Sequence, residues 1–313
     1  MKKYQKYILC RSALKRIIRT AGGAMLIIAS LVGCGGADTG NTIDNNDTDI
    51  AGKASDSDIA PIGAVDIATL NAPAEEDDTS NAVDADITVK RLEGAPDDFI
   101  YGVDVSSFMA EVDSGVKYYD YDGNELDNQG FFDFLAECGV NTVRIRIWND
   151  PKDSEGRTYG GGNNDVDTAQ QIGLLATNAG MKVLLDFHYS DFWADPGKQI
   201  VPKAWKDYSE EELENAVYDF TVKVMNEMHD ADAAPTMVQV GNEITNGLLW
   251  PTGQKPDFDG IARYINSGIR GVRAVDKDVD IMLHLDNGGL NPMYVEWFDN
   301  FVKRGEDFQI IGH

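Results

Sequence analysis

The feature that most constrains the fold is an alternation of short apolar runs with amphipathic stretches that begins at Phe99. The apolar runs predict strands over residues 100–105, 142–148, 182–188, 237–242, 280–285 and 308–311. The stretches between them predict helices over residues 129–138, 165–179, 210–229, 258–275 and 292–303. Repeated strand–helix units with nearly continuous apolar strands indicate a parallel sheet, built either as a closed (β/α)₈ barrel or as a doubly wound open sheet.

Local signals support these helix boundaries. Ser209 and Glu212 have the spacing of a capping box at the start of the third predicted helix. Gly139 and Gly180 stand where the first two helices should end in a left-handed residue.

The net charge and the residues after the first strand disfavour two functions, nucleic-acid binding and nucleotide binding. The formal net charge is -26, so the chain should repel nucleic acids and anionic polymers, and a neutral substrate is expected. The first strand is followed by no glycine-rich phosphate loop, which disfavours nucleotide binding.

The N-terminal segment, residues 1–33, has the pattern of an export signal. Its basic start is followed by an apolar run over residues 21–32 that is short for a membrane span. The run ends in Leu31-Val32-Gly33-Cys34, which resembles a bacterial lipobox and predicts lipidation of Cys34. A signal peptide without lipidation, or an N-terminal anchor helix, is the alternative. In each case the protein is expected to be exported, and with a lipid it is anchored to the bacterial cell envelope or cell surface.

Residues 34–98 differ in composition from residues 99–313. They are rich in Asp, Ala, Asn, Thr and Gly and poor in aromatic residues, so they bury too little surface to offset the entropy of ordering. We interpret them as a disordered acidic tether between the membrane and a domain that begins at residue 99.

Polar side chains recur on one face of several strands. Alternation along the strands predicts four inward-facing sets, namely Arg144, Arg146 and Trp148; Asp186 and His188; Gln239, Gly241 and Glu243; and Met282, His284 and Asp286. Charged groups inside a barrel are costly unless they are paired, so a polar site is predicted at the strand ends, with a buried structural ion-pair network as the alternative. Four tryptophans follow strand ends in predicted loops, where an indole can stack on a sugar ring: Trp148, Trp193, Trp205 and Trp250.

Longer motifs make the interpretation more specific. They are GVDVSS (102–107), VRIRIWNDP (143–151), YGGGNND (159–165), LDFHYSDFWADPGKQ (185–199) and VQVGNEI (238–244). Together they resemble glycoside hydrolase family 53, the arabinogalactan endo-β-1,4-galactanases, and the resemblance runs from about Phe99 to His313.

The resemblance implies a (β/α)₈ (TIM) barrel and a retaining, endo-acting hydrolase of β-1,4-galactan in plant cell walls. Glu243 matches the acid/base of this family, and Asn242 matches the residue that bonds the sugar 2-hydroxyl. Further residues are expected to line sugar subsites: Asp186, His188, Trp148, Asn149, Arg146, Trp250, His284 and Asp286. The expected partners are a neutral polysaccharide and, through the lipid, a membrane, with the chain itself a monomer.

The strand count departs from the family. Only about six of the eight strand–helix units are predicted, so residues 99–313 are expected to form a barrel truncated at its C-terminus. The strand-seven glutamate that serves the family as nucleophile then has no counterpart in this chain, which is expected to be inactive. No metal or other cofactor is expected here, whereas the resemblance implies calcium in some full-length members. Asp186 and Asp286 face inward, but retaining chemistry needs two carboxyl groups about 5 to 5.5 Å apart.

Two other functions stay open at this point. One is a retaining glycosidase of the same clan that acts on another β-glycan, such as mannan or glucan. The other is a surface lipoprotein that binds glycans without cleaving them.

Overall fold

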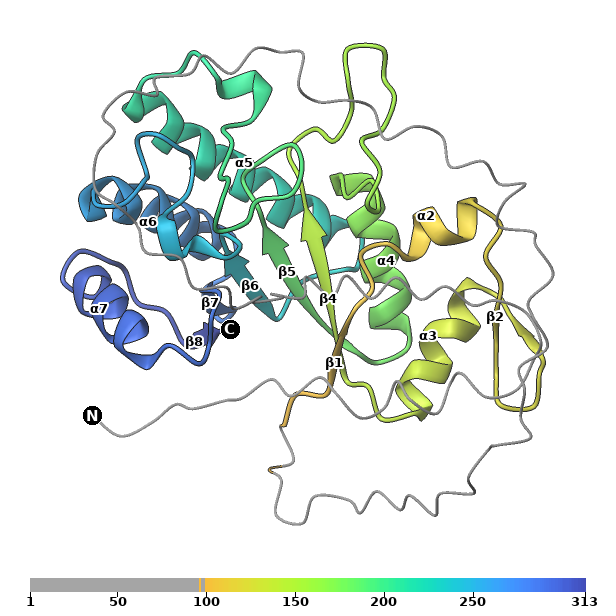
Figure 1. Ribbon diagram of the computed structural model, residues 1–313. Coiled ribbons are helices and arrows are strands. Elements are labelled where there is room, and N and C mark those ends of the chain that lie inside the picture. Colours follow the sequence, from red (N-terminus) through yellow and green to blue (C-terminus); the bar gives the residue numbers. More distant parts are fainter. Residues whose placement is uncertain (1–95, 97–98) are drawn as a thin grey trace, which may run out of the picture. The chain divides into compact units, whose positions relative to one another are not determined.

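The structure, a computed structural model, describes residue 96 and residues 99–313 (Figure 1). The predicted signal peptide, Cys34 and nearly all of the predicted tether lie outside the described residues. The described part is built on one sheet of six parallel strands. These are β1 (Gly102–Asp104), β4 (Thr142–Ile147), β5 (Lys182–Phe187), β6 (Met237–Val240), β7 (Asp280–His284) and β8 (Ile310–Gly312).

The order of the strands decides between the two architectures left open by the sequence. In the sheet they follow one another as β1-β4-β5-β6-β7-β8, which is their order along the chain, and every neighbouring pair is parallel. In a doubly wound sheet the order of the strands across the sheet reverses partway, whereas in a barrel each new strand is added on the same side of the one before it. The sheet therefore has the winding of a (β/α) barrel.

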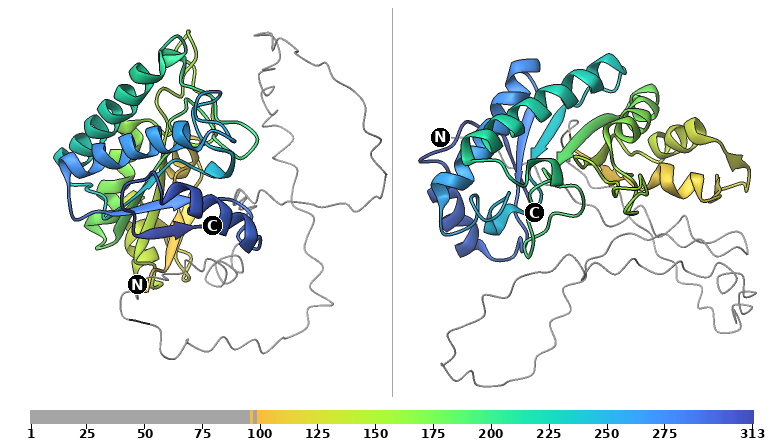
Figure 2. Two further views of the ribbon diagram at one scale, coloured as in Figure 1. Left: turned by 90° about the vertical axis from the view of Figure 1, so that its left-hand side faces the viewer. Right: turned by 90° about the horizontal axis from the view of Figure 1, so that it is seen from above.

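Five long helices connect the strands, and all five were predicted. They are α3 (Asn128–Glu137), α4 (Val166–Asn178), α5 (Glu210–Asp230), α6 (Phe258–Val275) and α7 (Asn291–Phe301). Figures 1 and 2 show α4, α5 and α6 together on one face of the curved sheet. Within the described part of the chain no helix is long and apolar enough to cross a membrane.

The predicted helix ends are confirmed. The Ser209 hydroxyl accepts a hydrogen bond from the Glu212 amide, and the Glu212 carboxylate accepts one from the Ser209 amide. Gly139 and Gly180 have φ angles of 91° and 76°. A residue with a β-carbon is disfavoured in this left-handed region, so glycine ends each helix.

The short elements between β1 and α3 were not predicted. They are α2 (Phe108–Asp113) and a hairpin of β2 (Tyr118–Tyr119) with β3 (Glu125–Leu126). Aromatic contacts hold the segment: the Phe108 ring stacks on Phe131 of α3 at 4.8 Å, and the tilted Tyr118 ring lies 4.3 Å from it. Strands of two residues have too little periodicity to be read from sequence, and contacts with α3 order them instead.

The two faces of the sheet differ in chemistry. Side chains such as Val143, Ile145 and Ile147 are fully buried in the main apolar core. A separate small apolar cluster contains Ile100, Leu184, Met237, Met282 and Ile310. Strand alternation puts Leu184 and Met237 of this cluster on the same face as Asp186 and Gln239, two residues nearer the N-terminal end of each strand. Polar groups on this face are therefore collected toward the C-terminal ends of the strands.

Close contact of α6 with the sheet gives the first testable prediction. A β-carbon on Gly268 would lie 2.6 Å from Tyr189 Oη and 2.8 Å from Val240 Cγ1. We expect Gly268→Ala to lower the free energy of unfolding by about 1–3 kcal/mol through overpacking. Urea denaturation measures the change. Gly289→Ala, at an open position, is the matched control, and equal stability of the two variants would contradict the packing.

Candidate active site

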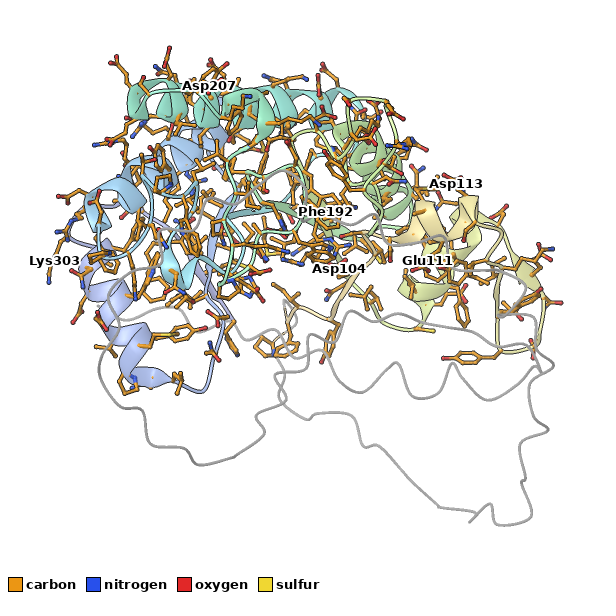
Figure 3. All side chains as sticks on the ribbon, turned by 45° about the horizontal axis from the view of Figure 1, so that its top comes forward. Asp104, Glu111, Asp113, Phe192, Asp207 and Lys303 are labelled. Carbon is orange, nitrogen blue, oxygen red and sulfur yellow. The ribbon has the colours of Figure 1, made fainter. Side chains whose placement is uncertain are left out.

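The guanidinium group of Arg144 lies at the centre of the polar groups inside the sheet. Arg144 Nη1 donates to Asp104 Oδ2 at 2.7 Å, and Nη2 donates to Asp186 Oδ2 at 2.6 Å. Further hydrogen bonds reach Gln239 Oε1 at 3.3 Å and Asn242 Oδ1 at 2.9 Å. These partners come from β1, from β5, from β6 and from the residues after β6, so the predicted convergence of polar side chains is confirmed. Figure 3 shows the labelled Asp104 in the central region of the described residues.

Arg144 also controls the ionisation of its two carboxylate partners. Burial is the largest single influence and raises the pKa of Asp104 and that of Asp186, but the opposing effects together hold both below the ordinary value: Arg144 acts on both, helped by Arg146 and Ser106 at Asp104 and by His188 and His284 at Asp186. Both groups are therefore charged at neutral pH. The network is an ion-paired one, as charges in a low-dielectric interior require.

A second layer lies against Asp186 and is completely enclosed. His188 Nε2 is 3.0 Å from Asp186 Oδ2, while His188 Nδ1 accepts hydrogen bonds from Trp148 Nε1 at 3.2 Å and from the Ala194 amide at 3.1 Å. Because Nδ1 accepts two hydrogen bonds, the ring proton is on Nε2 and is donated to Asp186.

The expectation that Trp148, Asp186 and His188 line sugar subsites needs correction. Their exposed fractions are 0%, 0% and 1%, and their polar atoms are bonded to other protein groups. These side chains lie beneath the site and fix its geometry. Trp205 is also buried, at 8% exposed, and its ring meets Phe220 edge-on at 5.9 Å.

Asn242 links this buried layer to the surface. Its Oδ1 accepts hydrogen bonds from Arg144 Nη2 at 2.9 Å and from His284 Nδ1 at 3.0 Å, and its Nδ2 donates to the Ala194 carbonyl at 2.8 Å. Burial next to Arg144 lowers the pKa of His284 to about 3, so this ring is neutral. Since one N–H of the amide is used by Ala194, the other remains for a ligand.

The chain changes direction just before Glu243. Strand β6 ends at Val240, and the next residues include Gly241 with φ 84° and Glu243 with φ 48°. The prediction that Gln239, Gly241 and Glu243 share one strand face is therefore wrong beyond Gln239, because strand alternation stops at this turn. A non-glycine residue in the left-handed region costs about 1–3 kcal/mol, and such residues cluster at active sites.

Gln199 supports this turn and was missed by the sequence analysis. Gln199 is 2% exposed, and its Nε2 donates to the Asn242 carbonyl at 2.8 Å and to the Asp195 carbonyl at 3.1 Å. Its own carbonyl accepts from the Trp250 amide at 2.9 Å. A buried glutamine in a predicted loop has no periodic signal, so only the folded structure reveals this role.

The electrostatic surroundings of Glu243 favour its protonated form. Partial burial and the neighbouring carboxylates of Asp286 and Asp195 raise the pKa of Glu243 to about 6, with Arg144 acting in the opposite direction. The ordinary value is about 4.3. Near neutral pH this carboxyl group can therefore both give and accept a proton.

The remaining predicted residues lie around this centre. Arg146 is 5% exposed, donates to the Gly161 carbonyl at 3.1 Å and stacks on Trp193. The Asn149 amide donates to the Ser190 carbonyl at 2.9 Å. Trp250 is partly exposed and its Nε1 donates to the Asn246 carbonyl at 3.1 Å. Among these three, Arg146 acts on the Arg144 network through its charge on Asp104, whereas these hydrogen bonds of Asn149 and Trp250 lie outside that network.

Asp286 is close enough to affect Glu243 through its charge, but its own oxygens accept hydrogen bonds from Thr245 and Asn287.

No cluster of three or more His, Cys, Asp or Glu side chains that could hold a metal ion occurs in residues 99–313. The calcium expected of some full-length members stays a prediction.

Fold and site together define the class of protein as a (β/α)-barrel protein with a carboxyl group of raised pKa, Glu243, just after the fourth barrel strand, β6. A sequence model described as "Glycosyl hydrolase family 53" matches residues 100–313. The chain belongs to this family.

Similar proteins agree with the assignment. An endo-beta-1,4-galactanase of Bacillus subtilis (strain 168) is 46% identical over 226 residues, covering 72% of this chain and 51% of that protein. An arabinogalactan endo-beta-1,4-galactanase of Thermothelomyces thermophilus is 38% identical over 217 residues, covering 67% and 62%. The chain thus spans between about half and two thirds of the length of these curated relatives.

A solved structure described as the Ignisphaera aggregans GH53 catalytic domain superposes with a TM-score of 0.69 at 41% identity, covering 72% of this chain and 61% of that one. A structure described as one of two fungal beta-1,4-galactanases gives 0.59 at 38% identity, covering 65% and 58%. The predicted fold, an incomplete (β/α)₈ barrel with about six of its eight units, is confirmed.

The raised pKa of Glu243 predicts a pH-dependent effect on stability. Because the folded-state pKa lies above the unfolded value, the folded state loses stability as pH rises from about 4.3 toward about 6 and beyond. Glu243→Gln removes this loss. We expect the variant to be more stable than the parent chain by about 1 kcal/mol at pH 7.5, after allowing for partial solvent screening, and equally stable at pH 4.

Thermal denaturation at the two pH values measures the effect, with Glu296→Gln on the exposed side of α7 as control. If the stability difference between Glu243→Gln and the parent chain is the same at pH 4 and at pH 7.5, the surroundings do not raise the pKa of this carboxyl group.

Proposed function

We propose that this chain carries the acid/base half of a retaining, endo-acting hydrolase of β-1,4-galactosidic bonds in arabinogalactan type I or pectic galactan. The observation that carries the proposal is the pKa of about 6 for Glu243, at the C-terminal end of a barrel strand beside Asn242. A general acid for glycosidic oxygen must hold its proton near neutral pH.

The proposed reaction has two steps. In the first, Glu243 gives its proton to the glycosidic oxygen as the bond to the anomeric carbon breaks, and a second carboxylate bonds to that carbon. In the second, ionised Glu243 removes a proton from water, whose oxygen displaces the enzyme carboxylate and regenerates both groups. The free N–H of Asn242 would donate to the 2-hydroxyl of the same sugar.

The substrate class is supported by two independent facts. The relatives at 46% and 38% identity are named as galactanases. The chain has a formal net charge of -26, which suits a neutral polysaccharide and disfavours an acidic one. The proposed partner is therefore the uncharged galactan itself.

The second carboxylate is proposed to lie in a longer form of the protein. The carboxylates that act on Glu243 in the described residues are Asp186, Asp195 and Asp286. Asp186 is held by Arg144, Asp195 accepts from the Gly197 amide, and Asp286 is bonded to neighbouring side chains. Each of these carboxylates thus has a structural partner, and we assign none of them as the second carboxyl group that retaining chemistry needs about 5 to 5.5 Å from the first. The 313-residue chain alone is therefore expected to be inactive.

Reducing-sugar release from β-1,4-galactan tests the proposal. We expect none from the purified 313-residue chain, clear release from a form as long as the curated relatives, and a loss of about 10²- to 10⁴-fold on Glu243→Gln in that longer form. Release by the 313-residue chain would refute the proposal that this chain lacks the nucleophile. Release by the longer form from mannan or glucan only would refute the substrate, and glycan binding without release would favour a non-catalytic binding protein.

We also propose that the protein is exported and attached to the cell envelope through Cys34, which lies outside the described residues. The support is the Leu31-Val32-Gly33-Cys34 motif after a basic and apolar leader. In a bacterial host, Cys34→Ser should move the protein from the detergent-soluble membrane fraction to the aqueous fraction. Retention of the variant in the membrane would favour an uncleaved anchor helix.

A further inference from the structure

We propose that Asn287 is a site of spontaneous deamidation, in which its side-chain amide becomes a carboxylate directly beside Asp286. Asparagine is chemically labile, and a following glycine has no side chain to hinder the backbone nitrogen that attacks it. The sequence contains Asn-Gly twice, as Asn246-Gly247 and Asn287-Gly288. The reaction needs neither a sugar nor a second carboxyl group, so it is independent of the proposed function.

The reaction is an internal attack followed by hydrolysis. The backbone nitrogen of Gly288 loses its proton and bonds to Asn287 Cγ, while the bond from Cγ to the side-chain nitrogen breaks and ammonia leaves with a proton. The product is a succinimide ring. Water then adds to either ring carbonyl and opens the ring to aspartate or isoaspartate. In sum one water is consumed, the amide becomes a carboxylate and ammonium is released, without any oxidant or reductant.

The turn that contains Asn287 leaves the attacking nitrogen free. Residues 287–290, between β7 and α7, are all exposed, and the Leu290 amide closes the turn by donating to the Asn287 carbonyl at 2.8 Å. In the part of the chain that the structure describes, the Gly288 amide donates no hydrogen bond. Gly288 lies against the side chain of His313, which is itself exposed. A surface turn with so few contacts opens at low cost.

The other pair, Asn246-Gly247, is protected by its surroundings. The Gly247 amide donates to the Ile244 carbonyl at 2.9 Å, and Gly247 is buried against the carbonyl of Gly253. Asn246 Nδ2 donates to the Pro196 carbonyl at 2.9 Å, which fixes the side chain. Attack at Asn246 therefore requires these hydrogen bonds to break first, so the same dipeptide should react at two different rates.

Deamidation changes the charge beside the acid/base carboxyl group. Asn287 Nδ2 donates a hydrogen bond to Asp286 Oδ2, and Thr245 donates to Asp286 Oδ1. A carboxylate in place of the amide replaces a donor to Asp286 by a like charge. Because Asp286 is one of the carboxylates that raise the pKa of Glu243, a second negative charge here acts in the same direction. The proton affinity of Glu243 then depends on the age of the protein.

Peptide mapping of the purified 313-residue chain by mass spectrometry, before and after incubation in mildly alkaline buffer, tests the site. At Asn287 we expect the mass gain of –NH₂ replaced by –OH, together with isoaspartate. The rate should exceed that at Asn246 by about tenfold or more, since the Gly247 amide must first lose its hydrogen bond. In concentrated urea the two rates should converge.

Asn287→Gln is the matched variant, because its longer side chain closes a larger ring that forms more slowly. It should remove the change at residue 287 and leave the rate at Asn246 as in the parent chain. Equal rates at the two pairs in the folded chain, a faster rate at Asn246, or reaction at Asn287 only in urea would overturn the site.

Asn287→Asp supplies the product directly and tests the effect on Glu243. NMR titration of the Glu243 carboxyl carbon should shift to higher pH in this variant. Asn300→Asp, which adds the same charge near the other end of α7, is the control and should titrate as the parent chain does. Identical titration of Glu243 in Asn287→Asp and in the parent chain would refute the effect of the new charge on the acid/base group.

Discussion

The pairing of Arg144 with Asp104 and Asp186 is the interaction on which the rest of the structure depends. Removing a guanidinium and two carboxylates from water costs several kcal/mol per ion unless the charges meet in good geometry. Here distances of 2.6 and 2.7 Å meet that condition and tie β4 to β1 and β5. Gln239 and Asn242 extend the same network to β6 and beyond, so one charge fixes the relative positions of four chain segments.

From this centre the site is organised in successive layers. The enclosed pair Asp186 and His188 lies deepest and Asn242 is 6% exposed, whereas Glu243 is partly exposed, as are Arg144 and Asp104 with 26% and 35% of their side-chain surface. The deeper residues use their hydrogen-bonding groups on one another, and the outer residues keep groups free. Such support holds a reacting group in place before a substrate arrives, which is where most electrostatic catalysis originates.

Much of the fold could be predicted because it rests on local patterns. The six strands and five long helices follow from apolar periodicity, and Ser209, Gly139 and Gly180 mark helix ends through short-range hydrogen bonds and φ preferences. The hairpin at residues 118–126 could not be predicted, because its two-residue strands are ordered by rings from α2 and α3. Within the site, the alternation of side chains along strands correctly predicted which face Arg144, Asp186 and Gln239 lie on, because all three stand inside strands.

The sequence by itself determined the strand–helix units, the position of Asn242 and Glu243 after a strand, and the family. Each of these depends on the order of residues along the chain. The tertiary structure alone decided which polar residues are accessible. Trp148 and His188 stand in a motif typical of sugar sites yet are enclosed, because neighbouring loops cover them. It also decided the pKa of Glu243, since desolvation and the fields of Asp286 and Asp195 arise only when segments distant in sequence meet in space.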